Sequence, residues 1–240
     1  METYGEFLRR IGEFETAELN LGREPFEVSP SLSDKVGPDN RFRPFFGDTS
    51  VFDLDGADKA YLDGLIGRLY SECGECFCER LERGCLHLTL HDLSSSPHFE
   101  LVRELLRERG EYFAANPLRG GETGFCKPVV MKAKSILNMV NISLVLGLYP
   151  ADEENYLRLC ALYEEMEKIS PLPYPMTPHI TLAYYGCGGF GAKSAAGLKK
   201  TVRELNERIG EKDIFLRPEN LFYEHFFSMN IYKKIHHLIK

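Results

Sequence analysis

A short stretch, His87-Leu88-Thr89-Leu90, recurs later in the chain as His179-Ile180-Thr181-Leu182. The alternation of polar and apolar residues in both copies is typical of a β-strand with one polar face and one buried face. Each histidine therefore shares a strand face with the threonine two positions on, while the residue between them points to the core. We expect the two strands to present two imidazoles and two hydroxyls to one cleft.

The elements around the two copies also recur in one order. Apolar residues at helical spacing predict helices at about 57–79, 97–114, 152–169 and 193–209. Alternating or apolar runs predict further strands at 49–54, 125–135, 140–148, 214–216 and 221–232. Each half therefore runs helix, strand, helix, strand, strand, which is an internal repeat of element order without overall sequence identity. We predict an α+β fold in which each half of the chain forms one of two similar lobes.

The beginning of the chain stands outside this repeat. Residues 3–14 carry apolar side chains at helical spacing and predict an amphipathic helix, whereas residues 21–47 are rich in Pro, Gly, Asp, Asn and Ser and predict an irregular segment. We divide the chain into this N-terminal part, residues 1–48, and a single bilobal domain, residues 49–240. The irregular segment either covers the cleft or braces the first lobe.

The composition limits the class of partner. The 240 residues include 29 basic and 36 acidic side chains, which disfavours a long duplex-binding surface, because such surfaces need many Lys and Arg to neutralise phosphates. A short nucleotide or oligonucleotide in a local basic cleft is compatible with the net charge of -7. No apolar stretch approaches the roughly 18 residues of a membrane span, and the chain begins with charges where a signal peptide is apolar. We expect a cytoplasmic monomer that binds no membrane.

Seven cysteines, an odd number, favour reduced thiols over a disulfide framework. Cys73, Cys76 and Cys78 form a C-x-x-C-x-C cluster, but a zinc site needs a fourth ligand and usually a second close pair, and neither lies near in the sequence. We interpret the three as buried free cysteines on a helix and predict no metal or other cofactor.

Two histidines and two threonines are suited to phosphoester cleavage. Imidazoles titrate near neutrality, so one can act as base while the other acts as acid, with each proton transfer contributing roughly 10²–10⁴-fold. Threonine hydroxyls can donate hydrogen bonds to non-bridging phosphoryl oxygens and hold the group between the imidazoles. A lone His-x-Thr in a strand is common and predicts nothing. Two His-x-Thr motifs at equivalent positions of a repeated order of elements predict in-line cleavage of a phosphoester without a metal.

On these two motifs the chain resembles the two-histidine (2H) phosphoesterase superfamily, also called LigT-like, from about Thr49 to the C-terminus. The resemblance implies a bilobal α+β fold with antiparallel sheets lining a central groove and helices outside. It also implies that His87 and His179 are the acid and base and that Thr89 and Thr181 position the phosphate. Members of the superfamily hydrolyse cyclic phosphates of nucleotides or ADP-ribose, cleave 2′-5′ linkages, trim RNA ends or join tRNA halves. The loop at 43–49 is also similar to an uncharacterised bacterial branch of cyclic-phosphodiesterase-like proteins, which says nothing about substrate.

Three further residues are candidate substrate contacts. His91 continues the face of the first motif, and it either contacts substrate or is a satisfied histidine at the rim. Tyr185 lies on the face of the second motif, where it either stacks a base or ribose or seals the core. Lys134, which shares a strand face with Lys132, either attracts a phosphate or lies on a solvated edge.

A competing motif follows the second copy. Gly186-Cys187-Gly188-Gly189-Phe190-Gly191 satisfies the G-x-G-x-x-G pattern of dinucleotide-binding sites, and Asp213 lies about the right distance downstream. That pattern belongs to the first βαβ unit of a parallel sheet, and no alternating βαβα array surrounds it here. We therefore expect a glycine-rich loop that flanks the groove.

The sequence favours a metal-independent phosphoric diester hydrolase that acts on a cyclic phosphate or 2′-5′ diester of a nucleotide or short RNA, with no role for duplex nucleic acid. The alternative is a module on the same fold that binds a nucleotide or RNA end without cleaving it. A nicotinamide-binding oxidoreductase built on the glycine-rich loop is a third hypothesis.

Overall fold

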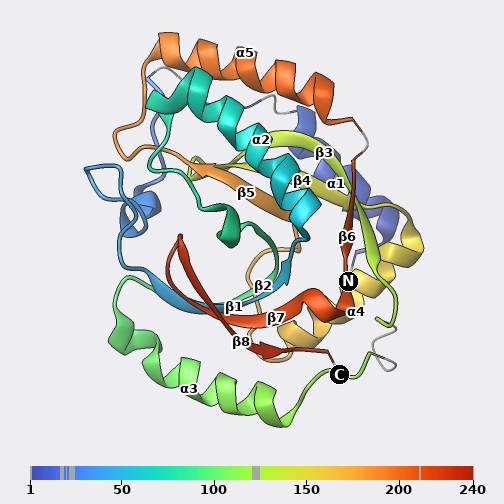
Figure 1. Cartoon of the computed structure of the whole chain (residues 1–240). Helices are drawn as coiled ribbons and strands as arrows, with labels where there is room; N and C mark the ends of the chain where they lie inside the picture. Colours follow the sequence, from blue (N-terminus) through green and yellow to red (C-terminus); the bar gives the residue numbers. More distant parts are fainter. Residues whose placement is uncertain are drawn as a thin grey trace.

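The computed structural model describes residues 2–16, 19, 21, 25–120, 125–210 and 212–239 (Figure 1). The helices are α1 (Tyr4–Thr16), α2 (Gly56–Cys73), α3 (Phe99–Ala115), α4 (Glu153–Glu167) and α5 (Ala192–Ile209). The strands are β1 (Phe46–Asp53), β2 (His87–Ser96), β3 (Val129–Met139), β4 (Ser143–Pro150), β5 (His179–Tyr184), β6 (Asp213–Leu216), β7 (Leu221–Ser228) and β8 (Ile231–His237). Short 3-10 turns are η1 (Pro30–Asp34), η2 (Gly74–Cys76), η3 (Arg83–Cys85) and η4 (Pro218–Asn220).

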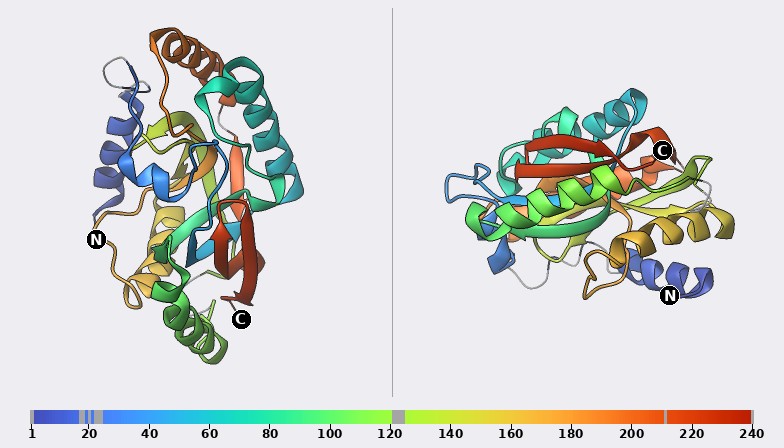
Figure 2. Two further views of the ribbon diagram at one scale, coloured as in Figure 1. Left: turned by 90° about the vertical axis from the view of Figure 1, so that its left-hand side faces the viewer. Right: turned by 90° about the horizontal axis from the view of Figure 1, so that it is seen from below.

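The strands form two antiparallel sheets, in the orders β2-β1-β7-β8 and β5-β4-β3-β6. The strand that carries a His-x-Thr motif is an edge strand in each sheet, and β2 and β5 lie side by side. Helices surround the sheets, with α2 beside α5 and α1 beside α4 (Figure 2). The predicted bilobal α+β class with antiparallel sheets is therefore confirmed.

The prediction that each half of the chain forms its own lobe is wrong. After α3, strand β3 crosses to the second sheet and pairs with β4, and after β6, strand β7 returns to the first sheet and pairs with β1. A tight turn, in which Val140 and Asn141 adopt positive φ angles of 45° and 58°, keeps β3 and β4 together as a hairpin, as β7 and β8 also are. The closing hairpin of each half therefore joins the sheet that contains the motif strand of the other half, and alternation within a strand does not reveal which sheet a hairpin joins.

The N-terminal part contacts both lobes. Phe7 and Ile11 of α1 form a small separate core with Tyr156 and Cys160 of α4. The segment that follows is hydrogen-bonded to the second lobe through Phe26, whose N–H donates to the Phe190 carbonyl at 2.8 Å. At its other end the Phe45 N–H donates to the Phe227 carbonyl of β7 at 3.0 Å. No helix among the described residues is long and apolar enough to cross a membrane.

The helix predicted at 57–79 is shorter than expected. α2 ends at Cys73, and the residues after it pair with the end of β5, where the Cys78 N–H donates to the Tyr184 carbonyl at 3.0 Å. Only Cys73 of the cluster lies in α2, Cys76 ends the 3-10 turn η2 and Cys78 lies beyond it, so the placement of all three on one helix is wrong. The three thiols are buried, and burial raises the pKa of Cys76 and Cys78 to about 12. In the described part of the chain, no group of three or more His, Cys, Asp or Glu could hold a metal ion.

Candidate functional site

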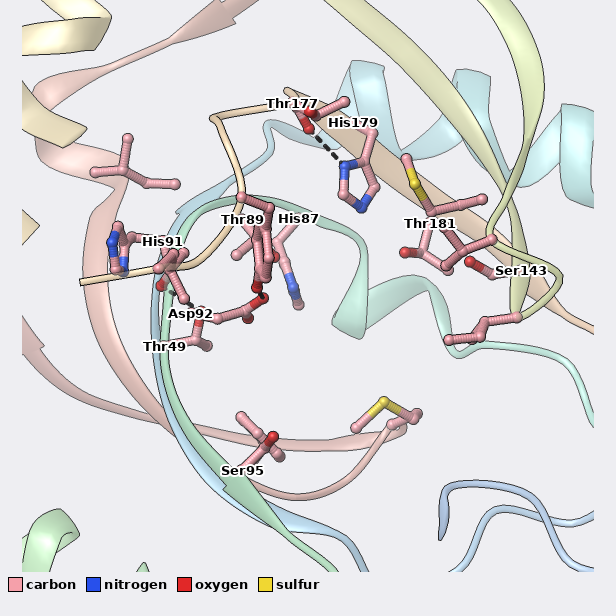
Figure 3. Close-up of a pocket in the computed structure, with 18 of the residues that line it drawn as sticks. Thr49, His87, Thr89, His91, Asp92, Ser95, Ser143, Thr177, His179 and Thr181 are labelled. Atoms are coloured by element: carbon pink, nitrogen blue, oxygen red, sulfur yellow. Dashed lines mark hydrogen bonds between the residues drawn. The ribbon is translucent and has the colours of Figure 1, made fainter. Parts of the chain in front are cut away.

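The two motif strands line one cavity of about 800 Å³ between the sheets. Figure 3 shows the imidazoles of His87 and His179 directed into this cavity, with Thr89 beside the first and Thr181 beside the second. The structure therefore brings together all four residues of the repeated motif, as the sequence predicts. Other parts of the wall come from α1, the segment before β1, the loop between α4 and β5, the end of β5, and the strands β7 and β8. They include Phe14, Lys35, Phe45, Tyr174, Met176, Tyr184, Phe226 and Tyr232.

Each motif is followed by the same irregularity. In β2, Val51 pairs with Thr89 and Ser50 with His91, so that Leu90 is an extra residue in the ladder. In β5, Val145 pairs with Thr181 and Leu144 with Ala183, so that Leu182 is the extra residue. A β-bulge of one residue resets which face the following side chains point to. The two motif strands therefore share not only the His-x-Thr sequence but also a bulge directly after the threonine.

The bulge in β2 moves His91 off the face of His87. Its side chain is fully buried, and its Nε2 lies 2.8 Å from Glu167 Oε1, on the other side of the strand from the cavity centre (Figure 3). Its ring also contacts Tyr163, with the centroids 4.9 Å apart. The bulge therefore overturns the expectation that His91 continues the motif face, although its side chain still reaches the cavity wall. Of the two interpretations the rim histidine fits better, but it is satisfied only at Nε2, because its buried Nδ1 has no hydrogen-bond partner among the described residues. Asp92, the next residue, also lines the cavity.

The bulge in β5 has the same effect on the second candidate. Tyr185 is fully buried, and its hydroxyl donates to Asn138 Oδ1 at 3.1 Å. It does not line the cavity, so a stacking role against substrate is wrong, and Tyr184 takes that position. Asp92 and Tyr184 therefore occupy matching places in the two lobes, each reached because one residue is inserted after the threonine.

Lys134 does not face the site either. It is exposed on β3, with its Nζ 5.5 Å from the ring centroid of Tyr149, and it is not part of the cavity wall. Of the two interpretations, the solvated edge fits this position. Lys132 on the same strand lies 3.2 Å from Asp213.

The glycine-rich loop packs against the N-terminal segment instead of flanking the groove. The ring of Phe190 stacks on Phe26 at 4.5 Å, and Gly189 has a φ of 62°. A Cβ at Gly189 would lie 2.1 Å from the Phe26 carbonyl oxygen, so glycine is required there for close approach. Both sheets are antiparallel, which excludes the parallel βαβ unit to which a dinucleotide fingerprint belongs.

The backbone fixes the ring of His179. Its Nδ1 lies 2.7 Å from the carbonyl oxygen of Thr177. A carbonyl only accepts, so Nδ1 carries the proton and the neutral ring keeps its lone pair on Nε2. For His87, the backbone of Cys85, again two residues before the histidine, lies near enough to favour the charged form of the ring. The ring of His87 also meets Tyr232 edge-on, with the centroids 4.8 Å apart.

Burial controls the protonation of both imidazoles. It lowers the pKa of His87 to about 4, although the charges of Asp92 and Asp53 oppose the shift. Burial also lowers the pKa of His179, where the Thr177 carbonyl and Asp92 oppose the shift and Lys35 adds to it. Both rings are therefore neutral at pH 7 while the cavity holds no anion.

Sequence reasoning missed the charged and aromatic residues that complete the site. Lys35 lies in the irregular segment, where no periodicity marks a side chain that enters the cavity. Asp92 and Tyr184 follow the bulges, and Tyr232 belongs to a strand that returns from the far end of the chain. The irregular segment therefore contributes to the cavity wall.

Comparisons with known proteins bear on the fold alone. No protein-family model and no curated protein matches the chain. The chain is similar to the crystal structure of a conserved protein of unknown function from Agrobacterium tumefaciens strain C58, ATU0111, with a TM-score of 0.63 and 14% identity over 90% of this chain and 97% of that one. A second structure, TT0787 of Thermus thermophilus, has a TM-score of 0.43 and 15% identity over 79% of this chain and 95% of that one. The first similarity supports the bilobal α+β fold.

Proposed function

We propose that the chain is a metal-independent phosphoesterase that cleaves a cyclic phosphate or 2′-5′ phosphodiester of a nucleotide. One observation carries the proposal: two equivalent, half-buried imidazoles from two edge strands open into one cavity, and the ring of His179 is fixed by a hydrogen bond to the backbone carbonyl of Thr177. To accept a proton from the nucleophile and to donate one to the leaving group, the two rings must each hold a nitrogen toward the substrate.

The chemistry for a cyclic phosphate uses one imidazole as base and one as acid. The base takes a proton from water while the water oxygen forms a bond to phosphorus, and the bond from phosphorus to one ribose oxygen breaks. The acid donates its proton to that leaving oxygen, so that one water molecule is added and a phosphomonoester remains. Thr89 and Thr181 donate hydrogen bonds to the non-bridging oxygens, which carry the developing charge.

The acid needs a proton that the free site lacks. Because burial lowers the pKa of both His87 and His179, the resting rings are neutral at pH 7. A phosphate brings negative charge into the same cavity and raises the pKa of the nearest imidazole. Substrate binding therefore takes up one proton and creates the acid–base pair.

The test is cleavage of a panel of 2′,3′-cyclic nucleotides, ADP-ribose cyclic phosphate and 2′-5′ dinucleotides in the presence of EDTA. We expect turnover by the natural protein and none by a variant that carries both His87→Ala and His179→Ala. Thr89→Ala and Thr181→Ala are expected to retain turnover with weaker substrate binding. Binding of these compounds without product would instead assign the same cavity to a module that recognises nucleotides without cleaving them. Since all seven cysteines are free thiols, we place this activity in the reducing environment of the cytoplasm.

A further inference from the structure

Among the described residues of the cavity wall, Lys35 is the lysine or arginine whose charge has no ion-pair partner. Its backbone is fixed on both sides: the Lys35 N–H donates to the Leu32 carbonyl and its own carbonyl accepts from the Arg43 N–H at 2.8 Å. The side chain crosses two aromatic rings, with Nζ 5.2 Å from the Phe45 centroid and 5.7 Å from that of Tyr184. The ammonium is therefore held at a defined place in the wall, by aromatic faces that favour a cation.

The surroundings of this ammonium leave room for an anion. Within the part of the chain that the structure describes, no carboxylate oxygen lies within 4.0 Å of Nζ, and the acidic groups that act on it from further away are Asp92 and Asp34. Burial lowers the pKa of Lys35, because water is partly removed and no ion pair replaces it. Tyr184 belongs to β5, the strand of the second motif, so the ammonium lies near that strand, and its charge also acts on His179. An anion between them would relieve the cost of burying an unpaired cation.

The other cation of the wall is already bound. The Arg10 guanidinium forms an ion pair with Glu2, and it donates to the Met176 carbonyl at 2.8 Å and to Thr177 Oγ1 at 3.2 Å. It thereby fixes the loop that leads to His179. Most of the remaining wall is aromatic or aliphatic, and Asp92 adds a negative charge. The described cavity therefore offers one unpaired positive charge.

We infer that Lys35 binds the phosphoryl group together with the threonine hydroxyls, and that the cavity selects substrates with a single phosphate attached to an apolar or aromatic group. The selection of substrates rests on the proposed function, whereas the binding of an anion by Lys35 does not depend on it. A second phosphate would lie without a cation near Asp92. A mononucleoside cyclic phosphate meets the requirement, whereas an RNA chain and ADP-ribose cyclic phosphate, which also carries a diphosphate, do not.

The anion site is tested first with sulfate, by calorimetry at low ionic strength. Lys35→Met keeps the apolar stem that packs on the two rings and removes the charge. Lys134→Met, on the exposed face of β3, is the matched control. We expect Lys35→Met to weaken sulfate binding about tenfold to a hundredfold, since a charge-assisted hydrogen bond is lost, and Lys134→Met to leave it unchanged. Equal sulfate affinity in all three proteins, with unchanged melting temperatures, would overturn the role of Lys35.

Substrate size is tested by kinetics with a 2′,3′-cyclic mononucleotide and an oligonucleotide that ends in the same group. We expect a lower kcat/KM for the oligonucleotide than for the mononucleotide, a salt dependence of the mononucleotide reaction with a log–log slope no steeper than about -1, as for a single phosphate contact, and poor cleavage of ADP-ribose cyclic phosphate. An equal or higher kcat/KM for the oligonucleotide would overturn selection for one phosphate. Lys35-dependent sulfate binding without turnover of any substrate would uphold the anion site and refute the proposed catalysis.

Discussion

The contact between Glu167 and His91 ties the end of α4 to the bulge of β2, and its removal has a calculable cost. Glu167 Oε1 accepts from two groups, lying 2.8 Å from His91 Nε2 and 3.1 Å from the Leu172 N–H. In Glu167→Ala, His91 is left fully buried without this partner, and the loop toward His179 loses an anchor. A buried donor without an acceptor costs about 1–3 kcal/mol. Because Leu172 is only partly buried, we expect a total of about 2–4 kcal/mol.

That loss corresponds to a decrease in melting temperature of roughly 5–15 °C for a chain of this size, measured by differential scanning calorimetry at pH 7. Glu167→Gln keeps an acceptor oxygen in place and should lose much less. Glu165→Ala, which removes a half-exposed carboxylate of the same helix paired with exposed Lys168, is the control and should melt as the natural protein does. If Glu167→Ala and Glu165→Ala melt at the same temperature, the argument from the buried donor is refuted.

Three further outcomes are expected. Sulfate binding should tighten as the pH falls from about 7 to about 5, by up to about tenfold per pH unit for each proton taken up. The reason is that burial lowers the pKa of His87 and of His179 in the free site, and a bound anion raises both pKa values again. A sulfate affinity that does not change with pH in calorimetry would contradict proton uptake. Gly189→Ala should reduce the free energy of unfolding, measured in urea, by about 1–3 kcal/mol through strain at positive φ and the clash with Phe26, whereas Gly188→Ala, where a Cβ meets nothing within 4 Å, should change it little. In thiol labelling of the folded protein, exposed Cys126 should react first and buried Cys76 and Cys78 only on unfolding; early modification of either buried thiol would contradict their placement.

Local sequence patterns predicted most helices and strands well, because the spacing of apolar residues depends only on the helix or strand in which they lie. The alternation at 87–91 and 179–184 marked both motif strands, and helical spacing marked α4 and α5 within a few residues. The four motif residues meet in the cavity because they sit on edge strands that lie side by side.

What the sequence could not predict depends on contacts between distant segments. The bulges at Leu90 and Leu182 exist only relative to the partner strands β1 and β4, so strict alternation put His91 and Tyr185 on the wrong face. The bulged backbone of β2 is stabilised from β1, where the Thr49 hydroxyl donates to the His91 carbonyl at 3.0 Å. Lys35 reaches the cavity because its backbone donates a hydrogen bond to the Leu32 carbonyl and accepts one from the Arg43 N–H, which fixes a segment that has no periodic pattern.

His87 and His179 are proposed to act as one catalytic pair. The most direct measurement is single-turnover cleavage of a 2′,3′-cyclic nucleotide by the natural protein, by His87→Ala, by His179→Ala and by the double variant, with folding checked by melting temperature. We expect the rate constant of cleavage to fall by at least roughly 10²–10⁴-fold in each single variant. The double variant should be little slower than either single variant, since proton transfer by the pair fails when one member is missing. Near-normal cleavage by either single variant would contradict the proposed pair.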